Sequence, residues 1–210
     1  GTSSTQWSAS SFNAQGKQTN YSFGVTGTLR RATTVTGVAS PNCAASSSSN
    51  TFDANGFSDQ VTDWNGNVTD YTFSAPGLET SRTEALGKAE QRTIETDWYV
   101  DQRLPEEIRE EGRTVNFTYE NGRVKTRVET DTTTHTVPYS TNGRTRQWTY
   151  TYTYHDAAQT QVASVSVNGP RTDVNDTQVF SFDTRGWLTE STNALNQTTR
   201  VLEHNLRGQP

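Results

Sequence analysis

The sequence is poor in the residues that build a closed core. It contains no methionine and one cysteine, and only 30% of its 210 residues are hydrophobic. A compact two-layer domain normally has a larger apolar share, so we expect a wide sheet with one packed face and much wetted surface. The lone Cys43 excludes a disulfide within the chain and any cysteine-based metal cluster, and we expect it to be a free thiol without a role.

Long apolar runs and clustered positive charge are also missing. No stretch approaches the roughly 20 apolar residues of a membrane-spanning helix, and no signal peptide is visible, so we expect no membrane insertion. The 18 Lys and Arg residues are outnumbered by 23 Asp and Glu residues, which gives a net charge of -5. Because binding to phosphates requires clustered Lys and Arg, nucleic acid is not an expected partner.

A spacing between aromatic residues and glycines recurs along the chain. An aromatic residue or histidine is followed four positions later by glycine at Phe12/Gly16, Phe23/Gly27, Phe52/Gly56, Phe73/Gly77, Tyr139/Gly143, Phe182/Gly186 and His204/Gly208. Whole units recur after 21 residues from Gly56 to Gly77 and after 22 residues from Gly186 to Gly208. Such fixed periods predict a repeat architecture. The unit is a β-hairpin, because Gly and Asn tolerate positive φ at turns and the β-branched and aromatic residues between them suit a pleated surface.

The repeats divide the chain into three regions. Residues 1–38 are predicted to form degenerate β-hairpin repeats, and residues 39–50 a flexible Ser-rich loop. Residues 51–210 hold the clearest repeats, including Asn121-Gly122, a strong hairpin turn. The pattern breaks over residues 98–111, where Pro105 opens either one helical turn or a strand. We favour the strand, because alternation resumes directly afterwards.

An alternating aromatic run marks the predicted core. Trp148, Tyr150, Tyr152 and Tyr154 alternate with threonines, so the four rings fall on one face of a strand. We expect rings of successive hairpins to stack into a ladder on this face. A β-propeller is a second architecture, since two units approach the ~40 to 45 residues of a four-stranded blade, but no blade-closing motif is present.

The sequence offers no catalytic, cofactor-binding or metal site, and we expect the protein not to be an enzyme. Three groups of residues were weighed against this conclusion. The histidines are scattered, and we expect His204 to serve as a ring in the aromatic ladder. The acidic residues between 106 and 111 are expected to form a solvated loop, and the acids or amides at turns to hydrogen-bond the turn backbone. These groups are His135, His155 and His204; Glu106, Glu107, Glu110 and Glu111; and Asp53, Asp63, Asp183 and Asn193.

With these motifs in hand, the chain resembles the RHS/YD-repeat family. The matching pieces are Phe52-Asp53-Ala54-Asn55-Gly56, Gly66-Asn67-Val68-Thr69-Asp70-Tyr71, Tyr119-Glu120-Asn121-Gly122-Arg123-Val124 and Phe182-Asp183-Thr184-Arg185-Gly186-Trp187-Leu188. The resemblance covers most of residues 50–210 and, more weakly, 10–37. It implies an all-β fold of repeated antiparallel β-hairpins in a curved, spiralling YD-repeat sheet, and strand twist of about 20 to 25° would make such a ribbon curl.

The resemblance also implies a function. Shells of this family occur in bacterial polymorphic toxins, insecticidal toxin complexes and teneurins, where they enclose a polypeptide. This chain lacks the family's core motif with its Asp-Pro segments, its self-cleaving site and a toxin domain. We therefore expect a non-catalytic structural segment of a secreted or surface-exposed bacterial shell, truncated at its C-terminal end and partnered by polypeptide cargo or the rest of a longer chain.

The alternative expectation is an extracellular adhesive or filament-forming module. Its partners would be a glycan bound by exposed aromatic rings, or further copies of the chain that pair through open sheet edges.

Overall fold

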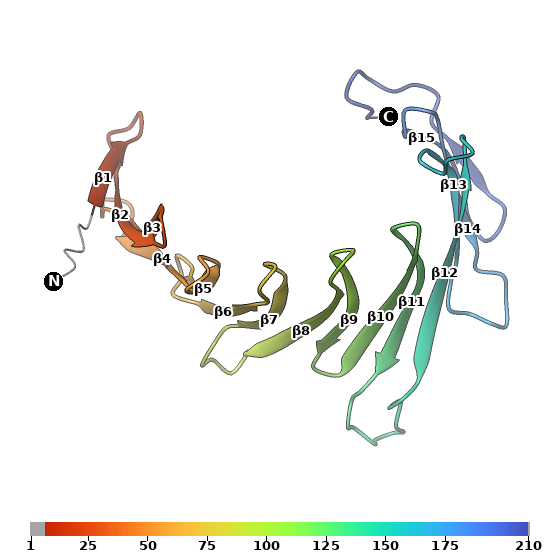
Figure 1. Ribbon diagram of the computed structural model, residues 1–210, viewed down its shortest axis with the longest axis horizontal. Helices are drawn as coiled ribbons and strands as arrows, with labels where there is room; N and C mark the ends of the chain where they lie inside the picture. The colour runs from red at the N-terminus through yellow and green to blue at the C-terminus, as the bar shows by residue number, and fades with distance from the viewer. Residues whose placement is uncertain (1–6, 210) are drawn as a thin grey trace. The chain divides into compact units, whose positions relative to one another are not determined.

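The computed structural model describes residues 7–209, which form sixteen β-strands and no helix. The strands lie in one sheet in the order of the sequence, β1 to β16, and every pairing that is resolved is antiparallel (Figure 1). The predicted all-β hairpin fold is therefore confirmed. The propeller alternative is wrong, because consecutive strands pair without division into four-stranded blades. Within the described residues no helix is long and apolar enough to cross a membrane.

The chain divides into two compact units. The first comprises residues up to 98 together with 109–111, and the second comprises 99–108 and the residues from 112 onwards. The strands of the first half are β1 (Trp7–Phe12), β2 (Gln18–Thr26), β3 (Leu29–Gly37), β4 (Ser46–Phe52), β5 (Ser58–Thr62), β6 (Val68–Phe73), β7 (Glu79–Glu84) and β8 (Arg92–Tyr99). Those of the second half are β9 (Leu104–Glu110), β10 (Arg113–Glu120), β11 (Arg123–Asp131), β12 (Thr145–Tyr154), β13 (Val162–Asn168), β14 (Gln178–Phe182), β15 (Leu188–Thr192) and β16 (Thr198–Arg200).

Six turns among the described residues are closed by the acid or amide that opens them. At Asp183 the backbone N–H donates to the carbonyl oxygen of Trp187 (2.9 Å), and the Gly186 N–H donates to the carbonyl of Asp183 (2.9 Å). The Asp183 carboxylate accepts the N–H groups of Arg185 and Trp187 at 2.8 and 3.0 Å. Gly186 has a backbone φ of +81°, a value that residues other than glycine rarely adopt. The same closure occurs at Asn13, Asp53, Asp63, Asn193 and Asn205, so the predicted role of the turn acids is confirmed.

The turn between β10 and β11 is of a different type. Asn121 and Gly122 have φ values of +52° and +73°. Two consecutive positive values are the requirement of a type I′ turn, whose twist matches that of the flanking strands. The predicted Asn-Gly hairpin is therefore confirmed.

The aromatic rings of successive strands share one face within each unit. In the second unit the register pairs Tyr150 with Val167, Tyr152 with Val165, and Val165 with Phe180. Directly opposed residues project to the same side of a sheet, so these side chains lie together. We call this side the ring face. The strands change direction gradually from β10 to β14, as twist requires (Figure 1).

The first unit follows the same rule. Trp7 lies opposite Phe23, and Tyr71 lies opposite Arg82, which in turn lies opposite Ile94. The other side of each unit carries hydroxyl groups that bond across strands at 2.6 to 3.0 Å, in the pairs Thr83–Thr93, Thr118–Thr126, Thr153–Ser164 and Thr192–Thr198. This hydroxyl side needs no cover from a second layer.

The rings do not form a closed core, contrary to the prediction. Trp148, Tyr150, Tyr152 and Tyr154 share a face but are only partly buried. The hydrophobic side chains below a tenth exposed among residues 7–209 are Leu78, Ile94 and Val115, all aliphatic. The reason is that one layer of strands covers only the flanks of a ring.

Large rings also pack against the glycine of the next repeat. A Cβ atom added to Gly77 would meet the ring of Phe57 at 2.8 Å, and one added to Gly208 would meet the indole of Trp187 at 2.7 Å. Phe57 and Trp187 directly follow Gly56 and Gly186, the glycines that lie one repeat earlier in the chain. Glycine therefore serves both the turn and the packing between neighbouring hairpins.

One predicted segment differs from the structure, and another is confirmed. Ser46–Phe52 is strand β4, which pairs with β3, so the prediction of a loop over residues 39–50 is wrong beyond residue 45. Residues 104–110 form strand β9 rather than a helical turn, as the favoured prediction stated. The remaining domain limits stay predictions, and the parts that fall on residues 1–6 and 210 lie outside the described residues.

Candidate functional site

The three histidines do not converge on a site. His135 lies in the loop between β11 and β12. A ring nitrogen of His155 lies 2.9 Å from the carbonyl oxygen of Phe182, and the ring of His204 packs 5.3 Å from that of Trp187. His204 therefore contacts a ring, as predicted. No group of three His, Cys, Asp or Glu side chains among the described residues is placed to hold a metal ion.

Three of the four acidic residues between 106 and 111 lie on a strand rather than in a solvated loop, and the fourth, Glu111, is exposed in the turn that follows. Glu106, Glu107 and Glu110 belong to β9, where alternation directs Glu107 to the side opposite the other two. Glu107 accepts a hydrogen bond from the Asn116 side chain. The sheet therefore separates Glu107 from Glu106 and Glu110.

An insertion in one repeat turn builds the most developed site. The N–H of Asp131 donates to the carbonyl of Arg144 (3.0 Å), and the Gly143 N–H donates to the carbonyl of Asp131 (2.8 Å). The Asp131 carboxylate also accepts the Thr133 N–H at 2.8 Å. This is the closure of the ordinary turn, except that eleven residues (132–142) separate the acid from the glycine where other turns have two. The Tyr139/Gly143 match is therefore not a separate hairpin, and that prediction is wrong.

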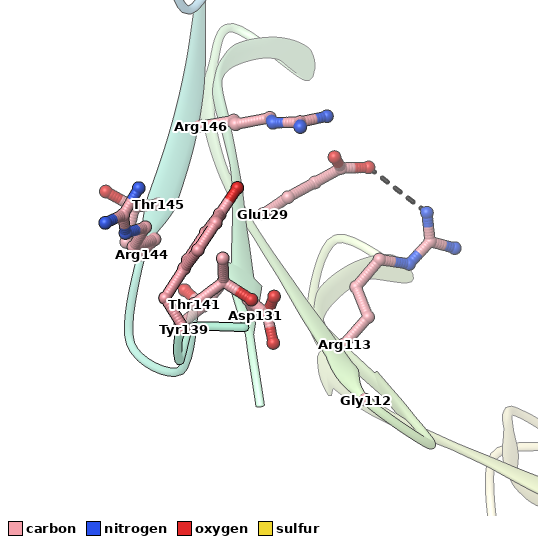
Figure 2. A pocket seen from close by; sticks show the side chains of 10 residues that line it. Gly112, Arg113, Glu129, Asp131, Tyr139, Thr141, Arg144, Thr145 and Arg146 are labelled. Atoms are coloured by element: carbon pink, nitrogen blue, oxygen red, sulfur yellow. Dashed lines mark hydrogen bonds and ion pairs between the residues drawn. The ribbon is translucent and has the colours of Figure 1, made fainter. Parts of the chain in front are cut away.

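The inserted loop and three strands enclose a pocket of about 490 Å³ in the second unit. Arg113 of β10, Glu129 of β11 and Arg146 of β12 line it, and the loop contributes Tyr139. Figure 2 shows Glu129 and Arg146 extending to the same side, with the Arg113 guanidinium reaching Glu129. Tyr139 is 61% exposed, and the Arg144 guanidinium carbon lies 5.8 Å from the centroid of its ring.

Arginines dominate the charge of this pocket. Glu129, whose side chain is 17% exposed, accepts from Arg113 at 3.2 Å and also from Arg127. Arg146 lies directly opposite Glu129 in the register. The side chain of Arg146 has no hydrogen bond or ion pair to any of the described residues. One carboxylate is therefore shared by two guanidinium groups, while a third is left with its donors unused.

The acid that closes the loop is held in its charged form. Hydrogen bonds from the Thr133 and Thr141 side chains, and from the Thr133 backbone, lower the pKa of Asp131 from 3.8 to about 2. Asp131 therefore remains an acceptor at all ordinary pH values. Its function is to hold the loop in place.

Arginine also covers rings elsewhere in the protein. Guanidinium carbons lie 3.8 to 5.8 Å from ring centroids in the pairs Arg30–Trp7, Arg31–Phe52, Arg123–Tyr154, Arg127–Trp148, Arg144–Tyr139 and Arg185–Trp187. A planar guanidinium can stack on a ring and keep its edge donors in water. The ring face thus presents apolar rings and hydrogen-bond donors together, a combination suited to binding.

Sequence reasoning did not identify Arg113, Glu129, Tyr139 or Arg146. The first and last of them, Arg113 and Arg146, are 33 positions apart in the sequence, and the register of β10 to β12 brings the strand residues together. The length of the segment between Asp131 and Gly143 was the available indication, because every other acid-to-glycine turn is short.

The comparisons with known proteins give likeness of fold alone. No family model and no curated protein matches the chain. Among solved structures, a crystal structure of TcdB2-TccC3-TEV is 14% identical with a TM-score of 0.48, covering 89% of this chain and 11% of that chain. A porin-like protein from Bacteroides uniformis ATCC 8492 is 13% identical with a TM-score of 0.42, covering 91% and 92%. A second crystal structure, of TcdB2-TccC3, is 13% identical with a TM-score of 0.24, covering 93% and 15%. This chain thus spans a small part of both TcdB2-TccC3 chains.

Proposed function

We propose that this chain is a non-catalytic wall segment of an RHS/YD-repeat shell, secreted or displayed at a bacterial surface. In this proposal the wall encloses a polypeptide, which is either cargo or another part of a longer chain, and screens it from solvent. The function depends on geometry, so no residue acts as a catalyst and no cofactor is required.

The observation that carries the proposal is the one-sided placement of the rings. Trp148 lies on the same face as Phe117 through their shared partner Arg127, and Tyr150 and Tyr152 follow along β12. These rings are partly buried, so their exposed edges form a broad surface along β12. Such a surface offers dispersed apolar contacts to an extended polypeptide without selecting one sequence.

The opposite side supports the same role. It carries Thr and Ser hydroxyl pairs that already bond to each other, such as Thr153 with Ser164 at 2.6 Å. A surface of satisfied hydroxyl groups remains wetted and has little tendency to bind apolar segments. The two sides of the sheet therefore differ in the way that a wall between cargo and solvent requires.

Protease protection tests the proposal. In the full-length protein that contains this segment, we expect the enclosed polypeptide to be digested more slowly than the same polypeptide alone. Replacement of Trp148 and Tyr150 by serine should increase digestion, whereas Thr151→Ala on the other side should not. Equal digestion of the enclosed and the free polypeptide would refute the shell function.

A second candidate is an extracellular adhesive or filament-forming module. It is favoured by the exposure of Trp7 and Trp64, which are 48% and 47% accessible. Acrylamide quenching of tryptophan fluorescence and electron microscopy separate the two candidates. Filaments joined end to end by strand pairing, together with loss of quenching on adding a glycan, would favour adhesion over enclosure.

A further inference from the structure

The pocket beneath the inserted loop differs from the repeating surface. Every other turn that an acid or amide closes on a glycine has two intervening residues, whereas the loop between Asp131 and Gly143 has eleven. In repeat proteins, insertions of this kind fall in loops and often supply the binding face. The volume of about 490 Å³ lies within the range of small-molecule sites.

The lining specifies the chemistry of a ligand. Arg146 offers an unused planar set of donors, which matches a carboxylate through two parallel hydrogen bonds. Arg113 lies on the other side of Glu129 and adds positive charge (Figure 2). Glu129 already accepts from Arg113 and Arg127, and its remaining lone pairs could accept a hydroxyl group of a ligand but not a carboxylate. Tyr139 provides an exposed flat ring at the rim.

We propose that this pocket binds an acidic saccharide. A uronic acid residue would place its carboxylate against Arg146 and Arg113, donate a hydroxyl group to Glu129, and lay one apolar face of its ring on Tyr139. Arg113, Glu129 and Arg146 lie on the ring face, where the inserted loop joins β11 to β12. The test of this site measures saccharide binding and not protease protection, so the two proposals can fail independently.

An acidic peptide fits the pocket less well. Peptides commonly bind by adding a strand to an exposed sheet edge. Here β11 is paired on both sides, with β10 and β12, and β12 is paired with β13, so no edge is available beside the pocket. Acidic side chains would also bring no hydroxyl donor to Glu129.

The test is titration of the isotope-labelled chain with trigalacturonic acid, monitored by amide chemical shifts in low salt. The neutral probe is the fully methyl-esterified trisaccharide, and the peptide probe is triglutamate. We expect shifts centred on residues 139–146, binding at least 10-fold weaker for the ester, and weakening with added salt because the contact is charged.

Variants link the binding to the named side chains. Arg146→Gln should weaken trigalacturonate binding at least 10-fold, and Arg146→Lys should weaken it less because the positive charge is kept. Tyr139→Ala should also weaken binding relative to the unsubstituted chain. Arg207→Gln, an exposed arginine far along the sequence, is the matched control and should have no effect. Unchanged circular dichroism confirms that each variant is folded.

Three outcomes would overturn the proposal. The first is that trigalacturonate causes no shift, and the second is that the acid and the ester bind equally. The third is that triglutamate binds as tightly as trigalacturonate and that Tyr139→Ala does not change its binding. The last result would indicate a peptide site. None of them bears on protease protection by the wall.

Discussion

Gly77→Ala tests the packing between successive hairpins. Gly77 has a φ of +79°, and an added Cβ would lie 2.8 Å from both Cε1 and Cζ of Phe57. The Phe57 ring cannot move aside freely, because it packs against the ring of Phe73, with 5.2 Å between the two ring centroids. The substitution therefore combines backbone strain with a steric clash. Gly66 is the matched control, with a φ of +78° and no atom within 4 Å of the added Cβ.

The two substitutions should differ by the cost of the clash. A left-handed conformation costs a non-glycine residue about 1 to 2 kcal/mol, which is the expected loss for Gly66→Ala. Overpacking adds roughly 1 to 3 kcal/mol where neighbours cannot move aside. We therefore expect Gly77→Ala to lower the free energy of unfolding by about 2 to 5 kcal/mol.

Urea denaturation monitored by tryptophan fluorescence measures both losses. A double-mutant cycle with Phe57→Ala isolates the clash, because removing the ring should reduce the cost of Gly77→Ala to that of Gly66→Ala. The reasoning is refuted if Gly77→Ala and Gly66→Ala destabilise equally, or if Phe57→Ala leaves the cost of Gly77→Ala unchanged.

Three further predictions concern single interactions. The Asp63 carboxylate accepts two turn amides, so Asp63→Ala should lower the denaturation midpoint while Asp63→Asn, the residue used by other copies, should not. The folded pKa of Asp131 is about 2, below its usual 3.8, so its contribution to stability is present above about pH 4. That contribution should be lost between pH 4 and 2, visible as a fall in the amide protection factors of the loop, which are corrected for the intrinsic pH dependence of exchange. Protection factors that do not change over this range would contradict it. Trp98→Phe removes the 2.7 Å hydrogen bond from the indole N–H to the Glu79 carbonyl and should cost about 0.5 to 1.5 kcal/mol in urea denaturation.

The turns could be predicted because each depends on few neighbouring residues. Asp183 and Gly186 are three positions apart and determine the closure between them, and Asn121-Gly122 fixes its own turn type. The faces could be predicted for a similar reason, since the period of a strand is two residues. Local chemistry was sufficient wherever the chain returned on itself within a few residues.

The errors arose where distant parts of the chain decide the structure. Ser46–Phe52 has the composition of a loop, yet β3 supplies backbone partners for it on one side and β5 on the other. The Tyr139/Gly143 spacing matched the repeat by coincidence, because the acid that closes this turn is Asp131. The pocket itself requires the register of three strands, which spacing along one sequence does not contain.

The choice of arginine over lysine follows from the single layer of strands. The chain has 15 arginines and 3 lysines. In a two-layer protein a second sheet or helix would cover the rings, but within each unit the described elements form one sheet. A guanidinium can lie flat on a ring while its edge pairs with a carboxylate, as Arg127 does between Trp148 and Glu129. Lysine has no flat group with which to do both. Arginine side chains thus take part of the role of the missing layer. Among the described residues Arg146 and Arg207 are exceptions, because the side chain of neither covers a ring or pairs with a carboxylate.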